Sequence, residues 1–311
     1  MAVLSLIFLQ IILPLLILLA VGAILHKVFA LHLKSFSKLL TYCLLPANTF
    51  VNIYQSRMPL AIFGQIILFL LLFSTFSISF TEIISRVTKM DRKTAATYKN
   101  SVVLMNSANY GIPVSQMVFH ANPLGVSIQL FVMIFQNLLT FTYGIFNLVS
   151  AKSGGRSVIK ELFKLPMLYA LLLGLICAGF RIEIPPILWK PVENMADAFL
   201  AVALITLGAQ IATIRPGKPH PVLYLSTFSR LVIGPGAALG IIFLLGLDGT
   251  VAQSLFIASS FPTSRNSSIL ALEYNNHPDL AAQAVLISTL FSTVTVTLVV
   301  WLAGILFPVT T

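Results

Sequence analysis

Charged residues are scarce in this chain. Asp, Glu, Lys and Arg make up 9% of its 311 residues, whereas apolar types make up 58%. A soluble domain carries about 25% charged residues, and a disordered chain has few apolar ones. The composition therefore excludes both classes and indicates an integral membrane protein with several spans.

Cysteine and the usual catalytic motifs are also scarce. Cys43 and Cys177 both lie inside apolar runs, where they read as small core residues. The sequence has no Walker A, HExxH or GxSxG motif, and we expect no pair of carboxylates inside the membrane. We therefore expect no catalytic residue, no metal site and no cofactor. No Lys/Arg run is interleaved with aromatics, so we expect no nucleic-acid partner.

Apolar segments near the length of a membrane-spanning helix follow one another along the whole chain. We predict an all-α fold with ten transmembrane helices. They lie near Val3–Leu25, Phe36–Ile53, Leu60–Ile84, Tyr98–His120, Leu124–Ser150, Leu165–Phe180, Pro191–Ile214, Pro221–Leu247, Val251–Leu272 and Leu280–Phe307. The first segment lacks a basic flank and a small-residue cleavage site, so we interpret it as a retained span.

Lys and Arg are distributed unevenly over the predicted loops. Fourteen of them lie in the odd-numbered loops, and only Arg57, Arg181 and Lys190 lie in the even-numbered ones. Cytoplasmic loops carry the excess of positive charge. This distribution predicts a multi-pass protein of the plasma or inner membrane with both termini outside the cytoplasm.

The two halves of the chain share local patterns. Leu13-Pro14 is followed by Gly22, and Leu165-Pro166 is followed by Gly174 at the same spacing. Phe135-Gln136-Asn137 in span five matches Phe291-Ser292-Thr293 in span ten. Either match alone can arise by chance, but the two occur in the same order. Because five is odd, a second five-span unit over 151–311 must insert upside down relative to the unit over 1–150.

Spans four and nine are interrupted by polar residues and proline. Span four contains the run from Asn106 to Pro113, and span nine the run from Ser259 to Ser268. Proline removes a backbone donor, and Gly111 permits unusual torsions. We predict that both helices break, with second halves that begin at about Ile112 and near Asn266. Such breaks are tolerated only where they line a cavity or are buried in protein.

The predicted breaks favour an anion site. Both second half-helices would direct their N-termini at the membrane centre, where each carries roughly half a positive charge and free N–H donors. Arg265 lies in the same region, and an unpaired arginine there costs about 2.5–3.5 kcal/mol. A substrate carboxylate would offset this cost, although structural pairing with freed helix carbonyls would do so too.

Four further polar or small-residue features lie within spans. We expect Arg230 to pair structurally with Asp197 or with a backbone carbonyl. Gln136 and Asn137 face either the cavity or a helix contact. Asn48 would contribute to the same site from the opposite wall of the cavity. Gly236 and Gly240 suggest close helix packing.

The order and spacing of these motifs resemble the auxin efflux carrier family, within the wider group that includes the bile acid–sodium symporters. The resemblance covers nearly the whole chain. It is carried by four features: Asn106 with Gly111-Ile112-Pro113, the run from Pro262 to Asp279, Arg230 with Gly234-Pro235, and Leu207-Gly208.

The resemblance implies two inverted five-span repeats with spans four and nine crossed. It implies a scaffold of spans one, two, six and seven, a mobile transport part made of the rest, and an elevator-like movement. Family substrates are organic acids. Two features depart from the family: the segment Ala151–Lys164 is short where auxin exporters have a long one, and Ser267 replaces a frequent proline.

We expect a secondary carrier for a small carboxylate, embedded in the bilayer and able to form a homodimer through its scaffold. The alternatives are an anion channel on the same fold and a receptor that binds a ligand without transporting it. Whether H⁺ or Na⁺ is the coupling ion stays open. The predicted substrate-binding residues are Asn48, Asn106, Asn109, Gly111, Pro113, Gln136, Asn137, Pro262, Arg265, Asn266 and Ser267.

Overall fold

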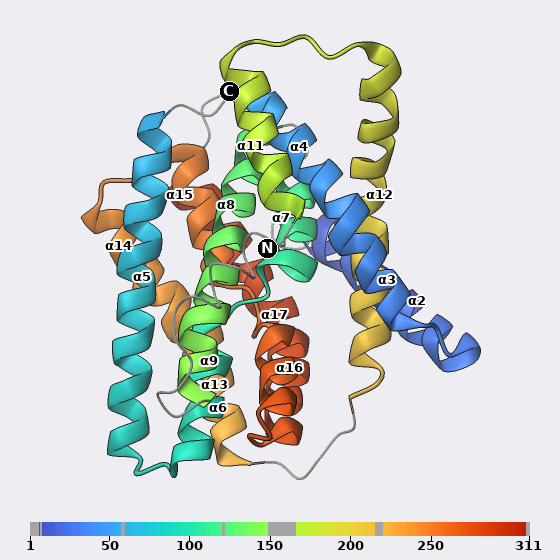
Figure 1. Cartoon of the computed structure of the whole chain (residues 1–311). Helices are drawn as coiled ribbons and strands as arrows, with labels where there is room; N and C mark the ends of the chain where they lie inside the picture. Colours follow the sequence, from blue (N-terminus) through green and yellow to red (C-terminus); the bar gives the residue numbers. More distant parts are fainter. Residues whose placement is uncertain are drawn as a thin grey trace.

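The computed structural model describes residue 6 and residues 8–56, 60–119, 122–148, 166–214 and 220–308 (Figure 1). These residues form helices and connecting loops, and no β-strand occurs among them apart from one isolated bridge. The predicted loop over 151–164 and the loop charges Arg57, Arg215 and Lys218 lie outside the described residues.

Helices occupy the predicted segments of the first half, with bounds shifted by a few residues. Several α-helices join through a single π-helical turn, labelled η. The elements are η1 (Phe8–Ile12), α2 (Leu13–Phe29), α3 (Leu33–Leu39), η2 (Leu40–Leu44), α4 (Leu45–Ser56), α5 (Leu60–Val87), α6 (Arg92–Val103), η3 (Ser107–Gly111), α7 (Ile112–Val118), α8 (Pro123–Leu139), η4 (Thr140–Gly144) and α9 (Ile145–Leu148).

The second half follows the predicted segments in the same way. Its elements are α11 (Pro166–Gly179), α12 (Pro186–Ile211), α13 (Pro221–Phe228), η5 (Ser229–Ile233), α14 (Gly234–Leu244), α15 (Gly249–Ser259), α16 (Arg265–Glu273) and α17 (Pro278–Leu306). The helix α12 begins five residues before Pro191, which lies inside it.

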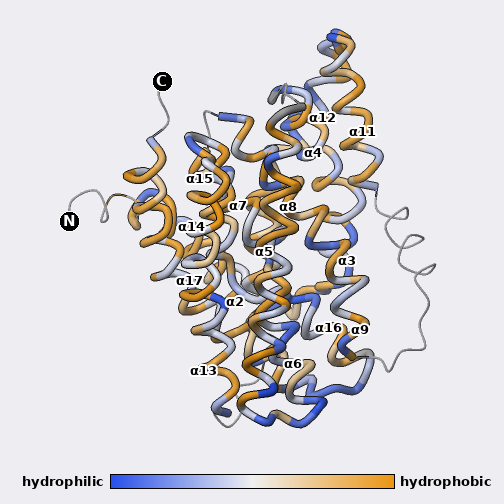
Figure 2. The backbone as a smooth tube through the Cα atoms, turned by 90° about the vertical axis from the view of Figure 1, so that its left-hand side faces the viewer, coloured by the Kyte–Doolittle hydropathy of each residue, from blue (hydrophilic) through white to orange (hydrophobic). Residues whose placement is uncertain are grey.

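The outer surface of the bundle is apolar, as a lipid-facing surface requires. Six helical stretches in the described residues are long and apolar enough to cross a membrane. Large apolar side chains such as Phe146, Ile187, Phe228 and Leu244 are exposed. Hydrophobic residues dominate the helices, whereas hydrophilic ones gather in the loops at one end (Figure 2). The chain is therefore a multi-pass membrane protein.

One group of helices packs through very close contacts. The helix α2 packs against α12, and α4 packs against both α11 and α12, on one side of the bundle (Figure 1). A Cβ atom on Gly22 would lie 1.9 Å from the carbonyl oxygen of Ile205, and one on Gly208 would lie 1.9 Å from that of Leu19. Only glycine permits the two backbones to approach this closely.

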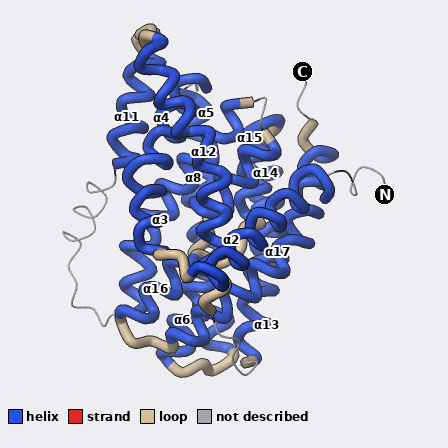
Figure 3. Tube along the Cα trace, turned by 90° about the vertical axis from the view of Figure 1, so that its right-hand side faces the viewer, coloured by secondary structure: helices blue, strands red, loops and turns tan. Residues whose placement is uncertain are grey.

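The remaining helices pack mainly with one another. Contacts join α5 to α6 and α14, and α15 to α8, α14 and α17. Loop segments lie inside this bundle as well as at its ends (Figure 3). Among the described residues, no heavy atom outside its own helix lies within 4 Å of a Cβ added at Gly236 or Gly240, so the predicted close packing at this pair is wrong.

Candidate functional site

Predicted span four is interrupted, but not at Gly111 and Pro113. The helix α6 ends at Val103, and Leu104 is extended, with φ −90° and ψ 112°. Helical structure resumes at Ser107 and continues into α7. Pro113 lies in the first turn of α7, after the π-helical turn η3, where its missing donor is tolerated. The α-helix α7 thus begins at Ile112, as predicted, but the π-helical turn η3 extends the second half-helix back to Ser107.

Gly111 is needed for packing. A Cβ atom at this position would lie 2.6 Å from a ring carbon of Phe261, in the other interrupted segment. Gly111 and Pro113 are buried and line neither the pocket described below nor its neighbours. The prediction that they contact substrate has no support in this geometry.

Predicted span nine breaks within one residue of the expected position. The helix α15 ends at Ser259, and α16 begins at Arg265. Ser264 is the N-cap of α16, and its hydroxyl accepts a hydrogen bond from the N–H of Asn266 at 3.2 Å. Serine is a favoured residue at this position because its oxygen satisfies an unpaired helix donor.

The two breaks cross and pair through their backbones. Met105 and Thr263 form an antiparallel bridge. The Asn106 N–H donates to the Pro262 carbonyl at 2.8 Å, and the Ser264 N–H donates to the Leu104 carbonyl at 2.7 Å. Each break thus supplies hydrogen bonds that water cannot supply inside a bilayer.

Side chains from two further helices complete the crossing. The Met105 N–H donates to Gln136 Oε1 at 3.2 Å. The Thr263 N–H donates to Ser288 Oγ at 3.1 Å. The two bridge residues are therefore each held by a side chain, one from α8 and one from α17.

Arg230 joins the ends of both first half-helices. It is 1% exposed and lies in the π-helical turn η5. Its Nη1 donates to the Val102 carbonyl at 2.8 Å, and its Nη2 donates to the Ser259 carbonyl. Its partners are thus backbone carbonyls, and the alternative partner Asp197 is wrong. The guanidinium carbon also lies 5.8 Å from the ring centroid of Phe73.

This arrangement separates the helix dipoles at the crossing. The C-termini of α6 and α15 each carry roughly half a negative charge, and the Arg230 guanidinium offsets both. The second half-helices begin at the same crossing with the opposite polarity. Their positive ends, together with Arg265, are left to face the space beside the break.

That space is a small pocket of about 50 Å³ at the crossing. It brings together six of the predicted residues: Asn106, Asn109, Gln136, Asn137, Arg265 and Asn266. Residues that the sequence analysis did not select complete its lining: Met105, Ser107, Ala108, Met133, Thr140 and Ser264. Ser107 and Ser264 lie in the two polar runs, so a wider selection around each break would have found them.

Several donors in this pocket have no protein partner. Asn106 is 4% exposed, and its amide nitrogen has no hydrogen-bond partner in the described residues. The Ser107 hydroxyl is unpaired in the same way. Arg265 is half-buried and forms no ion pair with a described residue. Buried donors of this kind are normally satisfied, so the pocket suits a ligand that accepts hydrogen bonds.

Three predicted residues have roles outside the pocket. The Pro262 carbonyl accepts the crossing hydrogen bond from Asn106, and the Ser267 hydroxyl donates to the Ser264 carbonyl at 2.7 Å. Asn48 lines a separate cavity, where its amide nitrogen donates to the Ala196 carbonyl at 3.3 Å. The α4 backbone places Asn48 against α12 instead of the crossing.

A wider cavity of about 370 Å³ adjoins the pocket through Arg265. It lies between α12 on one side and α16 and α17 on the other. Gln210, Ser268 and Asp279 supply polar groups to its wall. Arg265 therefore lies where the small pocket meets a larger space.

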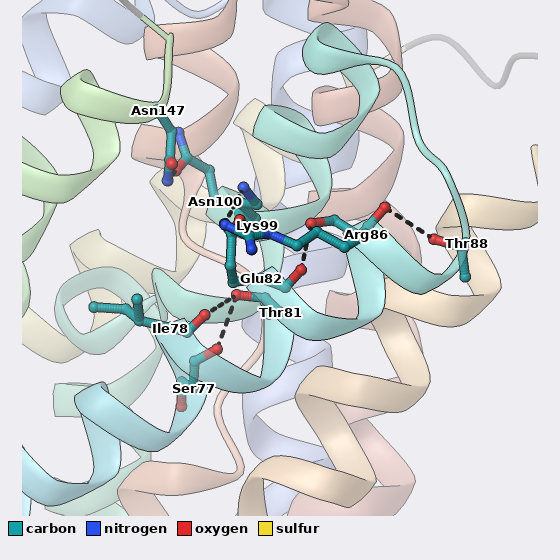
Figure 4. A network of polar contacts seen from close by, with 10 residues as sticks. Ser77, Ile78, Thr81, Glu82, Arg86, Thr88, Lys99, Asn100 and Asn147 are labelled. Carbon is teal, nitrogen blue, oxygen red and sulfur yellow. Dashed lines mark hydrogen bonds and ion pairs between the residues drawn. The ribbon is translucent and has the colours of Figure 1, made fainter. Parts of the chain in front are cut away.

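The half-helix α6 is anchored by an ion-pair network (Figure 4). Lys99 Nζ lies 2.5 Å from Glu82 Oε2 of α5, and Arg86 Nε lies 2.6 Å from the other carboxylate oxygen. Asn100 donates to the Gly144 carbonyl and accepts from Asn147, both at 2.9 Å. The contacts of Lys99 and Asn100, which belong to α6, fix the orientation of the first half-helix that ends at the crossing.

Comparisons with known proteins find similarity to membrane transporters. The profile of a family described as "Membrane transport protein" matches residues 150–300. A probable auxin efflux carrier component 1c of Oryza sativa subsp. japonica is 28% identical over 142 residues, covering 43% of this chain and 24% of that protein. Auxin efflux carrier component 1 of Arabidopsis thaliana is 29% identical over 143 residues, covering 43% of this chain and 23% of that protein.

An uncharacterized transporter of Methanocaldococcus jannaschii is 23% identical over 174 residues, covering 54% of this chain and 55% of that protein. The chain thus matches about a quarter of the length of the two auxin efflux carriers. The profile match to the second half of the chain and these relatives support the assignment of the chain as a membrane transporter similar to the auxin efflux carriers.

Proposed function

We propose that this transporter is a secondary carrier for a small organic anion whose carboxylate binds at the helix crossing. One observation carries the proposal. Arg230 offsets the negative helix ends, whereas two positive helix ends, Arg265 and the unpaired Asn106 amide lie around one pocket. Paired helix N-termini with a cation are suited to an anion.

The size of the two cavities bears on how the substrate lies. A pocket of about 50 Å³ has room for little more than a carboxylate group. The adjoining cavity of about 370 Å³ has room for the rest of a small organic acid. Arg265 borders both, so it would contact the carboxylate from the side by which the substrate enters.

We place this site within two inverted five-span repeats, over 1–150 and 151–311. Matching contacts in the two halves support the arrangement. Gly22 of α2 approaches Ile205 of α12, and Gly174 of α11 has its nearest contacts on Ile53 and the Phe50 carbonyl of α4. A rotation that exchanges the halves would interchange these two contacts, as it would the Gln136 and Ser288 contacts with the bridge.

We further propose that transport is an elevator-like movement of the crossing against a scaffold. The scaffold would consist of α2, α3–α4, α11 and α12, whose close glycine contacts resist sliding. The wider cavity supports this division because it separates scaffold helix α12 from α16 and α17 of the moving part. We also propose that the protein forms a homodimer through the scaffold. It would lie in the cell membrane with both termini outside the cytoplasm.

The decisive experiment measures uptake of radiolabelled dicarboxylates by proteoliposomes. Arg265→Gln should abolish saturable uptake, and Arg265→Lys should retain part of it, while the melting temperature of each variant stays near wild type. Arg86→Gln is the matched control, because the Arg86 side chain is 78% exposed and is not among the residues that line the pocket. Unchanged uptake in Arg265→Gln would remove this residue from the site.

Counterflow separates a carrier from the two alternatives. A carrier exchanges internal for external substrate, whereas a channel conducts without exchange and a receptor binds without flux. Binding without flux in the wild-type protein would contradict the transport proposal while leaving the anion site intact.

A further inference from the structure

Two carboxylates lie one turn apart within the long apolar helix α12. Glu193 and Asp197 have the i, i+4 spacing that places them on one face. Asp197 is the twelfth residue of α12, so it lies ~16 Å along the helix from Pro186. The expectation that no span contains a carboxylate pair is therefore wrong. Acidic residues at such depth are costly and mark ion or substrate pathways.

Both carboxylates border a cavity of about 300 Å³ that is rich in oxygen acceptors. Its walls come from α4 and α12 on one side and from α7 and α8 on the other. Besides the two acids, it is lined by the amides of Asn48, Asn52, Gln55 and Gln116. This cavity is separate from the pocket at the crossing, and the two share no lining residue.

Two amide oxygens in this lining have no hydrogen-bond partner. Asn48 is 1% exposed, and its amide nitrogen is committed to the Ala196 carbonyl, which fixes the oxygen as the unpaired atom. Gln116 Oε1, from the opposite wall, is also buried without a partner in the described residues. Amide oxygens only accept hydrogen bonds, so both lack a donor or a cation.

The charges of the cavity leave a single uncompensated carboxylate. Lys190 Nζ lies 3.0 Å from Glu193 Oε2 and neutralises that acid. Asp197 is exposed to the cavity and has neither an ion pair nor a hydrogen bond with any described residue. Carboxylate and amide oxygens are the ligands that hard cations prefer.

We propose that this cavity binds one monovalent alkali cation, Na⁺, between Asp197 and the amide oxygens of Asn48 and Gln116. The net charge of −1 matches one monovalent ion, and a divalent ion would leave an excess positive charge at mid-span depth. Asp197 supplies the charge, whereas Asn48 and Gln116 supply neutral oxygens from opposite walls.

The two walls of the cavity belong to different parts of the proposed elevator, so this step rests on the proposed function. Asn48 and Asp197 belong to the proposed scaffold, whereas Gln116 belongs to the proposed moving part. The complete ligand set then exists only when the two parts hold the present arrangement. Bound Na⁺ would therefore stabilise this state over the other.

Sodium binding can be tested without any transport measurement. The purified protein is titrated with NaCl, with choline chloride holding the ionic strength constant, and its melting temperature is recorded. We expect a saturable rise with Na⁺, and in Asp197→Asn a weakening of the apparent Na⁺ affinity by about tenfold or more. Asp279→Asn, which removes a carboxylate from the other cavity, should respond like wild type.

Asp197→Asn could fail to fold, so the test includes a second variant, Gln116→Leu, and a second measurement, the direct binding of radioactive sodium. Gln116→Leu keeps the charge and should weaken sodium binding in the same assay. The proposal is overturned if choline and Na⁺ give the same melting curve, if only divalent cations raise the melting temperature, or if both variants bind sodium as wild type does. Because no carboxylate is present and the chloride concentration is constant, failure here leaves the anion carrier untouched.

Discussion

Met105 and Thr263 lie opposite each other in an antiparallel bridge at the point where two helices are interrupted. The residues are far apart in the chain, yet the N–H of each is held by a side chain from another helix. The bridge brings four helix ends together. The charge at the crossing therefore depends on what neutralises each end.

Arg230 should be essential for the stability of the crossing. In Arg230→Met, the carbonyls of Val102 and Ser259 lose their donor, at about 1–3 kcal/mol for each group left unsatisfied. We expect a clearly lower melting temperature in detergent. Arg230→Lys should recover only part of the loss, because one ammonium cannot match the two-pronged guanidinium.

The control for Arg230 is Arg86→Met, which removes an exposed ion pair. Such pairs contribute about 0–1 kcal/mol, so its melting temperature should stay near wild type. Equal stability of Arg230→Met and Arg86→Met would show that the two carbonyls are satisfied in another way.

Asn106 should contribute to binding and not to the stability of the empty protein. Its amide nitrogen is buried and unpaired, so Asn106→Leu removes a donor without breaking a hydrogen bond of that nitrogen. We expect the melting temperature without ligand to be unchanged or higher, and the rise caused by a carboxylate ligand to be lost.

Asn147→Leu provides the comparison for Asn106, because its amide donates to Asn100. It should lower the melting temperature and keep the ligand-induced rise. A full ligand response in Asn106→Leu would contradict the assignment of its amide to the site.

Gly22 should tolerate no side chain. In Gly22→Ala, the new Cβ would lie 1.9 Å from the Ile205 carbonyl oxygen, so α2 and α12 must separate. Overpacking of this kind costs about 1–3 kcal/mol or more. Gly240→Ala is the control: no described residue lies within 4 Å of its new Cβ, and alanine favours the helix by about 0.5–1 kcal/mol. A melting temperature in Gly22→Ala as high as in Gly240→Ala would show that the helices meet differently.

The N-cap of α6 should make stability depend on acid pH. The Asp91 carboxylate accepts hydrogen bonds from the N–H groups of Thr94 and Lys93 at 3.1 and 3.0 Å, and its hydrogen bonds with Thr94 are the main cause that lowers its pKa. A lowered pKa means that the stabilisation is complete above the unfolded value of about 4 and is lost as the pH falls through the folded pKa.

Asp91→Ala should therefore cost about 1 kcal/mol at neutral pH and less at strongly acid pH, where the protonated carboxyl is a weaker acceptor. Asp91→Asn keeps the cap without a titrating group, so its difference from Asp91→Ala should not depend on pH. Melting temperatures of the three proteins across this range check both statements. A wild-type advantage over Asp91→Ala that is as large at strongly acid pH as at neutral pH would refute the assignment.

Much of the protein could be predicted from the sequence alone. The scarcity of charge determined the membrane class, and the runs of apolar residues determined where the helices lie, because both are local properties. The same holds for the polar runs around Asn106 and Arg265. Polar residues inside the bilayer are costly, so these runs indicate a break or a binding site within the helix that contains them.

Only the tertiary structure decided what these residues contact. Pro113 is accommodated by a π-helical turn, so the break moved to Leu104–Asn106. Arg230 reaches carbonyls 128 and 29 residues away, Asn48 turns to another cavity, and Asp197 meets amides from a different helix. Such partners depend on how helices pack, and packing is set by many weak contacts between distant segments that no local pattern records.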